Sequence, residues 1–154
     1  MSNNVINELI KYGQLAGNKG LTSGISGNIS ARFGENVIIT SSGSANGYLE
    51  KTDFSLIDYS GSVIEGNPKP SSEKFLHIEY YKKRPDINCI FHTHSPYLTA
   101  FASCGKALDE DISPEIIYCF GKIPLAEYGI PGSDELVAKT SKYFEDYDVI
   151  LLAN

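Results

Sequence analysis

The segment Ile87-Asn88-Cys89-Ile90-Phe91-His92-Thr93-His94 decides how the rest of the chain is interpreted. Its apolar residues predict a short buried strand that runs directly into two histidines. Because side chains alternate between the faces of a strand, His92 and His94 are expected to point the same way. Two imidazoles on one face can hold Zn²⁺ from one wall of a cleft, and a third protein ligand would then come from elsewhere. The alternative is that both histidines serve only packing or hydrogen bonding.

The composition is that of one globular domain without a basic surface. The chain has 154 residues, of which 42% are hydrophobic and 21% charged, and these values suit a single domain with its own core. Thirteen Lys and Arg against 19 Asp and Glu give a formal net charge of −6. Because nucleic-acid backbones are bound by basic patches, no nucleic-acid partner is expected. A small phosphorylated ligand needs only local donors and remains compatible with this charge.

Cysteine usage and hydropathy predict a cytoplasmic protein without a membrane partner. Cys89, Cys104 and Cys119 are scattered and form no CxxC pair, so reduced thiols are expected rather than a disulfide framework or a zinc knuckle. The N-terminus has no signal-peptide core, and no apolar run approaches about 18 residues.

Periodicity and turn residues predict one α/β domain with a mainly antiparallel sheet flanked by helices. Helices are expected over 5–16, 71–84, 96–102 and 133–144, with Ser133 as an N-cap. Further strands are expected over 28–33, 36–40, 54–59, 63–64, 122–125 and 148–152, while 115–120 fits a helix or a strand. The sequence ends at Asn154, two residues after the last predicted strand and without a closing helix. We therefore expect residues 1–154 to form a single domain that is truncated at its C-terminus.

Three segments rich in Gly and Ser carry the groups that a phosphate needs, namely Gly24-Ile25-Ser26-Gly27-Asn28, Ser41-Ser42-Gly43 and Ser71-Ser72. Glycine lets the backbone approach an anion, and successive N–H groups form an anion-binding nest. The third segment also lies at a predicted helix N-terminus, which favours negative charge. Each segment could equally be an ordinary turn or cap. A Walker-type lysine loop and a strand-linked GxGxxG are absent, so nucleotide binding is not expected.

Glu73 and His77 have two interpretations each. Glu73 lies in the first turn predicted for the 71–84 helix, where the dipole alone favours an acid. It could instead be a general acid/base or a carboxylate beside a metal. His77 shares its helix face and could be a third ligand. Because it lies between Leu76 and Ile78, a structural role is expected for His77.

Five motifs together resemble the class II aldolase/adducin family in order and spacing. They are Ser26-Gly27-Asn28-Ile29-Ser30, Thr40-Ser41-Ser42-Gly43, Pro70-Ser71-Ser72-Glu73, His92-Thr93-His94 and Tyr128-x-x-Pro131-Gly132. The resemblance covers essentially the whole chain. Within the family, the chain is most similar to sugar-phosphate aldolases of the L-fuculose-1-phosphate type.

The resemblance implies a three-layer α/β/α fold and a cyclic homotetramer with active sites at subunit interfaces. It also implies Zn²⁺ or another divalent metal held by three histidines. His92 and His94 would be ligands, and Glu73 would coordinate the resting metal and act as catalytic acid/base. His77 matches a family histidine that does not bind metal. Phosphate binding would fall to Ser26, Asn28, Ser42, Gly43, Ser71 and Ser72.

Two departures from the family pattern concern the chemistry. In the family, the last strand runs into the third histidine ligand, whereas this sequence ends with Leu151-Leu152-Ala153-Asn154. Some family aldolases also use a tyrosine of an adjacent subunit as a proton donor. The corresponding stretch here, 113–118, offers Tyr118 or Glu115, and neither is assigned to that role.

The expected function is that of a zinc-dependent carbon–carbon lyase. It would cleave a ketose 1-phosphate to dihydroxyacetone phosphate and a short aldehyde, with the metal stabilising the enediolate and Glu73 moving the proton. The family alternatives are a pentulose-phosphate 4-epimerase, a methylthioribulose-phosphate dehydratase and an inert adducin-like scaffold. A metal-free module that binds sugar phosphates is the alternative outside the family.

Overall fold

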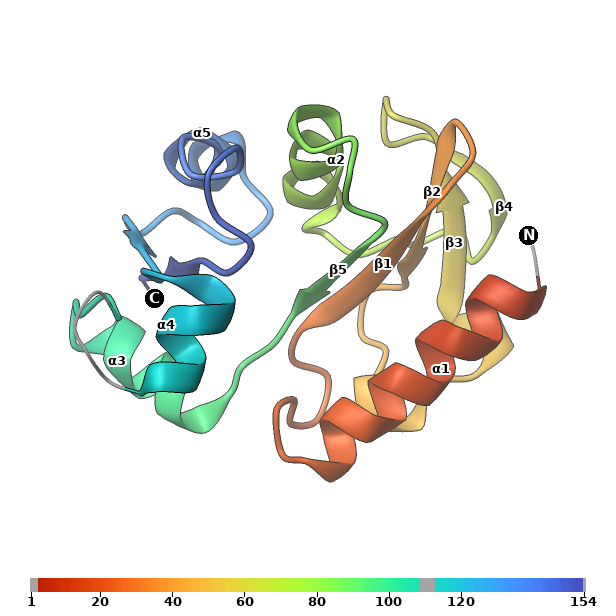
Figure 1. Cartoon of the computed structure of the whole chain (residues 1–154). Helices are drawn as coiled ribbons and strands as arrows, with labels where there is room; N and C mark the ends of the chain where they lie inside the picture. Colours follow the sequence, from red (N-terminus) through yellow and green to blue (C-terminus); the bar gives the residue numbers. More distant parts are fainter. Residues whose placement is uncertain (1–2, 109–112, 154) are drawn as a thin grey trace.

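A five-stranded antiparallel sheet forms the centre of the molecule. The computed structural model describes residues 3–108 and 113–153, and Asn154, where a truncation is expected, lies outside them. The strand order is β4-β3-β2-β1-β5 (Figure 1). Every neighbouring pair is antiparallel, which confirms the predicted sheet type. The strands are β1 (Asn28–Phe33), β2 (Asn36–Thr40), β3 (Phe54–Ile57), β4 (Val63–Gly66) and β5 (Cys89–His92).

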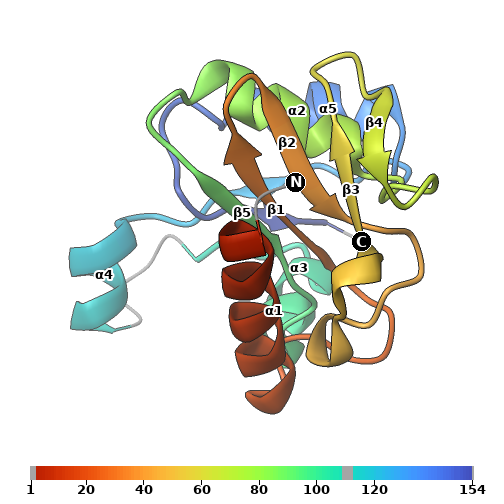
Figure 2. The ribbon, with the colours of Figure 1, turned by 90° about the vertical axis from the view of Figure 1, so that its right-hand side faces the viewer.

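Helices cover both faces of this sheet because the inner strands are apolar on both faces. Ile38 of β2 packs on the side of α1 (Asn3–Asn18), in a cluster with Ile6 and Leu9. Its neighbours in sequence, Val37 and Ile39, point the other way and pack with α2 (Lys74–Lys83). Each such buried side chain contributes about 1.5–3 kcal/mol. Helix, sheet and helix are therefore stacked as the predicted three layers (Figures 1 and 2).

The second half of the described chain forms a smaller unit beside β5. Its elements are α3 (Pro96–Ser103), α4 (Pro114–Phe120), β6 (Leu125–Ala126), α5 (Asp134–Ser141) and β7 (Leu151–Leu152). β6 and β7 pair in parallel, and Leu151 joins a small core with Ala102, Leu108 and Ile123. Helix α4 projects away from the sheet (Figure 2). None of the described helices is both long and apolar enough to cross a membrane.

Several predicted boundaries are confirmed and others are wrong. The bounds of β1 and β2 are as predicted, and the Ser133 side chain caps α5 by accepting a hydrogen bond from the Leu136 amide. The segment 115–120 is helical. The predicted strand 122–125 is reduced to β6 with a single bridge between Ile123 and Leu108, and 148–152 is reduced to β7. The predicted 71–84 helix begins only at Lys74, so Glu73 is the N-cap residue rather than part of the first turn.

The prediction of a buried histidine strand is wrong. β5 lies at one edge of the sheet, and its residues alternate between exposed and half-buried. Phe91 is 39% exposed, and His94 lies two residues beyond the strand. Apolar composition predicts a strand but cannot show how many neighbours cover it.

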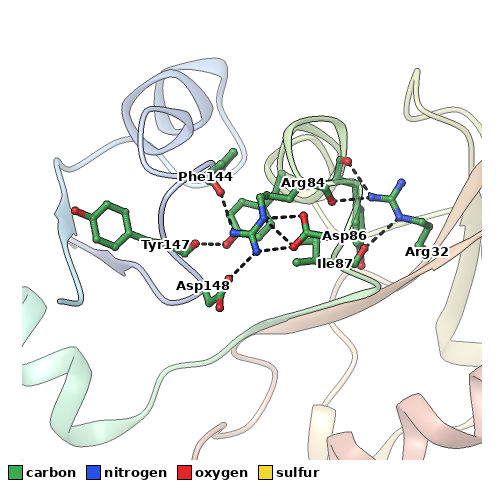
Figure 3. A network of polar contacts seen from close by, with 9 residues as sticks. Arg32, Arg84, Asp86, Ile87, Phe144, Tyr147 and Asp148 are labelled. Atoms are coloured by element: carbon green, nitrogen blue, oxygen red, sulfur yellow. Dashed lines mark hydrogen bonds and ion pairs between the residues drawn. The ribbon is translucent and has the colours of Figure 1, made fainter. Parts of the chain in front are cut away.

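Two arginines connect the end of α2 to the segments around it (Figure 3). The Arg32 guanidinium donates to the carbonyl oxygens of Tyr81, Arg84 and Ile87 at 2.9–3.2 Å. Arg84 in turn forms ion pairs with Asp86 at 2.7 Å and with Asp148 at 2.8 Å. The second of these pairs holds the segment that leads into β7 against the turn that leads into β5.

Candidate active site at the end of the edge strand

Glu73 lies where α2 begins, against the ends of β1 and β5. Asn28 and His92 are paired across these two strands, so both side chains reach the same place. The Asn28 amide Nδ2 donates to Glu73 Oε2 at 2.7 Å, and His92 Nδ1 lies 2.5 Å from the same oxygen. The ring nitrogen is not aligned for a regular hydrogen bond, although the two atoms are in contact. One carboxylate oxygen is therefore held between two strands, with Glu73 only 8% exposed.

The surroundings of Glu73 favour its ionised form. Burial raises the pKa of the carboxyl group, but the contact with His92, the charge on that ring and the Asn28 hydrogen bond all lower it. The net result is a pKa of about 2. Glu73 is consequently a carboxylate at neutral pH, with one of its two oxygens accepting the Asn28 hydrogen bond and contacting His92.

His92 and His94 lie on the same side of the chain, as strand alternation predicts. Their rings are stacked with centroids 5.1 Å apart and planes inclined by 10°. Burial lowers the pKa of His94, and the charge on His92 adds to this effect. A neutral imidazole is the form that binds metals.

The three Gly/Ser segments meet these acidic and imidazole groups around one cavity of about 260 Å³. The second and third segments come together because Ser41 forms an isolated bridge with Pro70. Across it, the Ser42 amide donates to the Lys69 carbonyl and the Ser71 amide to the Thr40 carbonyl, both at 2.9 Å. The cavity is lined by Ile25, Gly27, Asn28, Ser41, Ser42, Gly43, Ser71, Ser72, Glu73, His92, His94, Pro131, Leu136 and Leu152.

Of the six residues predicted to bind phosphate, five line this cavity, and Ser26 does not. The Ser26 hydroxyl donates to the Ser23 carbonyl at 2.6 Å and closes a local turn. Two other atoms near the cavity, Ser41 Oγ and Asn28 Oδ1, are buried and have no hydrogen-bond partner within the described part of the chain. Such orphaned polar atoms are expected where a ligand completes the site.

Other predicted candidates lie away from the cavity. His77 Nδ1 forms a 2.7 Å hydrogen bond with Ser30 Oγ, and burial lowers the pKa of the ring to about 3, so His77 is a neutral core residue. Tyr118 and Glu115 are on α4 and do not line the cavity. Pro131 does line it, and the neighbouring Gly132 packs against Ser72. Leu136 and Leu152 also reach the cavity, and nothing in their sequence context distinguishes them from ordinary core residues.

The donor groups of Glu73, His92 and His94 suit a divalent metal. In the described structure, however, two of these groups contact each other directly. Two imidazoles and one carboxylate are ligands that Zn²⁺ accepts. Glu73 Oε2, however, touches His92 Nδ1 directly. Within residues 3–108 and 113–153, no three His, Cys, Asp or Glu side chains are grouped so that they could hold a metal ion.

Comparison with known proteins assigns the chain to a family. Residues 7–154 match the family described as Class II Aldolase and Adducin N-terminal domain. The chain belongs to this class II aldolase and adducin family. Its members include metal-dependent lyases, so the family places the chain among class II aldolases.

Relatives within the family differ in the reactions that their names describe. The L-fuculose phosphate aldolase of Methanocaldococcus jannaschii is 40% identical over 131 residues, which are 85% of this chain and 70% of that protein. The 3-oxo-tetronate 4-phosphate decarboxylase of Haemophilus influenzae is 35% identical over 152 residues, which are 95% of this chain and 71% of that protein. Both names describe enzymes that act on small phosphorylated sugar derivatives.

The fold is also that of a solved class II aldolase. A structure of L-fuculose 1-phosphate aldolase matches the whole of this chain with a TM-score of 0.91 and 34% identity, and the match covers 73% of that protein. The predicted class II aldolase fold is therefore confirmed.

Proposed function

We propose that this class II aldolase cleaves a ketose 1-phosphate, of the fuculose 1-phosphate type, into dihydroxyacetone phosphate and a short aldehyde. The observation that carries the proposal is the meeting of the Gly/Ser segments with Glu73, His92 and His94 around one cavity. This cavity combines a neutral, polar wall for an anion with a carboxylate and two imidazoles. Those are the two halves of a site for a phosphorylated sugar.

The phosphate would bind at the wall formed by Ser42, Gly43, Ser71 and Ser72, with Asn28 beside it. Gly43 has a positive φ of 83°, which turns the backbone in a way that larger residues adopt only with strain. The start of α2 lies at this wall, and the positive end of the helix dipole there favours an anion. The orphaned Ser41 hydroxyl offers one further donor.

His92 and His94 are the proposed imidazole ligands of Zn²⁺ or another divalent metal, with Glu73 as the carboxylate ligand of the resting enzyme. When bound, the metal would supply Lewis-acid stabilisation of the charge that develops on the sugar oxygens. Glu73 would accept the proton from the reacting carbon of dihydroxyacetone phosphate in the condensation direction and return it during cleavage. Asn28 would orient the carboxylate through its 2.7 Å hydrogen bond.

The assembly, location and domain boundary remain part of this proposal. The proposed assembly is a homotetramer, and association between copies is supported by the apolar side chains that α4 exposes, namely Ile117, Phe120 and the 90% exposed Tyr118. Light scattering coupled to size exclusion would test it. We further propose that the protein works in the cytoplasm and that residues 1–154 form one class II aldolase/adducin-like domain.

The test is a retro-aldol assay with L-fuculose 1-phosphate and added Zn²⁺, in which dihydroxyacetone phosphate is measured. Substitution of Glu73→Gln should lower turnover about 100-fold or more, because it removes the proton carrier while keeping the shape of the side chain. A parallel assay with 3-oxo-tetronate 4-phosphate measures CO₂ release. CO₂ release without any dihydroxyacetone phosphate from ketose 1-phosphates would overturn the proposal, and so would full activity in Glu73→Gln.

A further inference from the structure

Strand β1 and helix α2 face each other with polar side chains at matching intervals. Side chains two residues apart share a face of a strand, and on β1 the face toward α2 carries Asn28, Ser30 and Arg32. Residues four apart share a face of a helix, and this spacing relates Glu73, His77 and Tyr81. Two strand residues span about 6.4–6.8 Å and four helical residues about 6 Å. The two series therefore remain opposite each other over three successive positions.

Hydrogen bonds join the first two positions of these series. The Asn28 amide Nδ2 donates to Glu73 Oε2 at 2.7 Å. Two residues further along β1, Ser30 Oγ forms a 2.7 Å hydrogen bond with His77 Nδ1 and a 2.8 Å hydrogen bond with Tyr81 Oη. The contacts follow the same order along the strand and along the helix. Together they define one register of α2 on β1.

Arg32 makes the third contact of the series. Its guanidinium lies over the Tyr81 ring, 4.9 Å from the ring centre, and donates to the Tyr81 carbonyl oxygen at 2.9 Å. A further hydrogen bond joins the guanidinium to the carbonyl oxygen of Arg84, where α2 ends (Figure 3). The C-terminal end of α2 is thus attached to the same strand as its N-terminal end.

The line through Ser30 consists of neutral groups that are sealed from water. Ser30, His77 and Tyr81 are each at most 1% exposed. Burial raises the pKa of the Tyr81 hydroxyl above its ordinary value of 10.0 and lowers the pKa of His77, so the phenol stays protonated and the imidazole stays neutral. A serine hydroxyl has one proton, so Ser30 donates to one of these partners and accepts from the other. Breaking the line would leave buried polar atoms unpaired, which is costly.

Packing alone does not account for polar residues at this place. An apolar cluster occupies the space between the sheet and α2, and its buried members are Val37, Ile39, Ile57, Ile78 and Tyr81. Apolar side chains in place of Ser30 and His77 would extend this cluster without the cost of burying polar groups. Hydrogen bonds form only within a narrow range of distance and angle, whereas apolar surfaces tolerate small displacements. Buried polar contacts therefore select one position of the helix on the strand.

The candidate site lies at one end of this contact series. Asn28 and Glu73 line the 260 Å³ cavity, whereas Ser30, His77 and Tyr81 do not. Glu73 is the N-cap of α2, and its carbonyl oxygen accepts a hydrogen bond from the His77 amide at 3.4 Å. A displacement of α2 by one residue along its axis is about 1.5 Å. Such a displacement would break the 2.7 Å contact between Glu73 and Asn28.

We propose that Ser30, His77 and Tyr81 are positioning residues of the candidate active site. Their hydrogen bonds fix the register of α2 on β1 and thereby hold the Glu73 carboxylate against Asn28 and His92. The three residues lie outside the cavity and act only through Glu73. The inference rests on the proposed function in one respect, which is that Glu73 moves the proton.

A double-mutant cycle on the ligand-free 154-residue chain tests the coupling to Glu73. Tyr81→Phe removes one hydroxyl and keeps the packing of the ring. Tyr81 and Glu73 share no hydrogen-bond partner within the described residues, so independent effects of their substitutions would add. We expect Glu73→Gln to shift the urea midpoint less in the Tyr81→Phe background than in the native chain, because a carboxylate that is held less firmly contributes less.

Tyr80→Phe is the matched control for this cycle. Tyr80 is the preceding residue of the same helix, and its hydroxyl donates to the Tyr147 carbonyl oxygen instead of Ser30. The control therefore also removes a phenol hydrogen bond, but one that does not connect α2 to β1. In the Tyr80→Phe background, Glu73→Gln should shift the urea midpoint as much as in the native chain.

Kinetics separates positioning from a loss of general stability. In the retro-aldol assay with added Zn²⁺, Ser30→Ala should lower kcat about tenfold or more, because a displacement of about 1 Å at the reacting groups is costly. KM should change by less than about twofold, since Ser42 and Gly43 of the phosphate wall do not belong to β1 or α2. Ser30→Thr keeps the hydroxyl and should restore most of kcat. Tyr80→Phe should leave both constants unchanged.

Three results would overturn the inference. They are additive midpoint shifts in the Tyr81→Phe cycle, equal non-additivity in the Tyr80→Phe cycle, and an active chain in which Ser30→Ala leaves kcat unchanged. A chain without activity on any ketose 1-phosphate would contradict the proposed function, whereas the ligand-free cycle would still decide whether Tyr81 positions Glu73. Because that cycle uses Tyr81→Phe, a failure of Ser30→Ala to fold does not affect it.

Discussion

At the scale of single residues, Gly27 fixes how closely β1 can approach the histidine segment. A Cβ atom at Gly27 would overlap the His92 carbonyl oxygen, and the φ angle of 75° lies in the left-handed region. Gly34 has a similar φ of 57° but open space around it. Gly27→Ala should therefore destabilise the fold by more than Gly34→Ala, which carries only the conformational cost of about 1–2 kcal/mol. Urea denaturation of both variants measures the difference, and equal losses would contradict the packing argument.

Also at the residue scale, Glu73 should make the stability of the protein depend on acid pH. Its folded pKa of about 2 is below the ordinary value of 4.5, so its contribution is present above pH 4.5 and is lost as the pH falls toward 2. The difference in unfolding free energy between the native chain and Glu73→Gln should therefore shrink by up to about 3 kcal/mol between pH 6 and pH 2.5. Denaturant titrations at several pH values measure it. A constant difference would mean that the contacts of Glu73 do not favour its charged form.

At the scale of elements, Arg84 holds the smaller unit against the sheet. Its ion pairs with Asp86 and Asp148, together with a hydrogen bond from the guanidinium to the Phe144 carbonyl, link α2 to the segment before β7 (Figure 3). Arg84→Lys keeps the charge but cannot contact all three partners. We expect a loss of about 1–2 kcal/mol and faster amide exchange at Leu151 and Ala153. Lys82→Ala, which removes only an exposed pair with Glu79, should cost less than about 0.5 kcal/mol.

The elements also show which parts of the fold are encoded locally. The β1–β2 hairpin and the start of α5 were predicted to the residue, because turn and cap preferences depend on neighbours in the sequence. The prediction that β5 is buried is wrong, since burial depends on which strands lie beside it. The candidate site was predicted as separate motifs, and its assembly depends on the long-range bridge between Ser41 and Pro70. The inclusion of Leu136 and Leu152 in the cavity and the exclusion of Ser26 follow from that tertiary arrangement alone.

At the scale of the whole molecule, zinc binding must be separated from binding to thiols. The three cysteines are free and exposed in part, so Cys104 and Cys119 can compete for added metal. We expect that a Cys104→Ser, Cys119→Ser background still binds about one Zn²⁺ per chain. Ligand binding to the native state raises stability by about 2.7 kcal/mol at a concentration 100 times the Kd. Thermal unfolding of this background with and without Zn²⁺ measures that gain.

The decisive comparison adds His94→Ala to the same background. His94 stacks on His92 but forms no hydrogen bond or ion pair within the described residues, so its removal should cost little stability in the absence of metal. If His94 is a ligand, the gain from Zn²⁺ should disappear in this variant while the unfolding temperature without metal stays close to that of the background. His77→Gln is an unsuitable control because that ring is buried against Ser30, whereas Asn36→Ala changes the first residue of β2, which does not line the cavity. An undiminished gain in His94→Ala would place the metal elsewhere and would leave Glu73 to act at a site without His94.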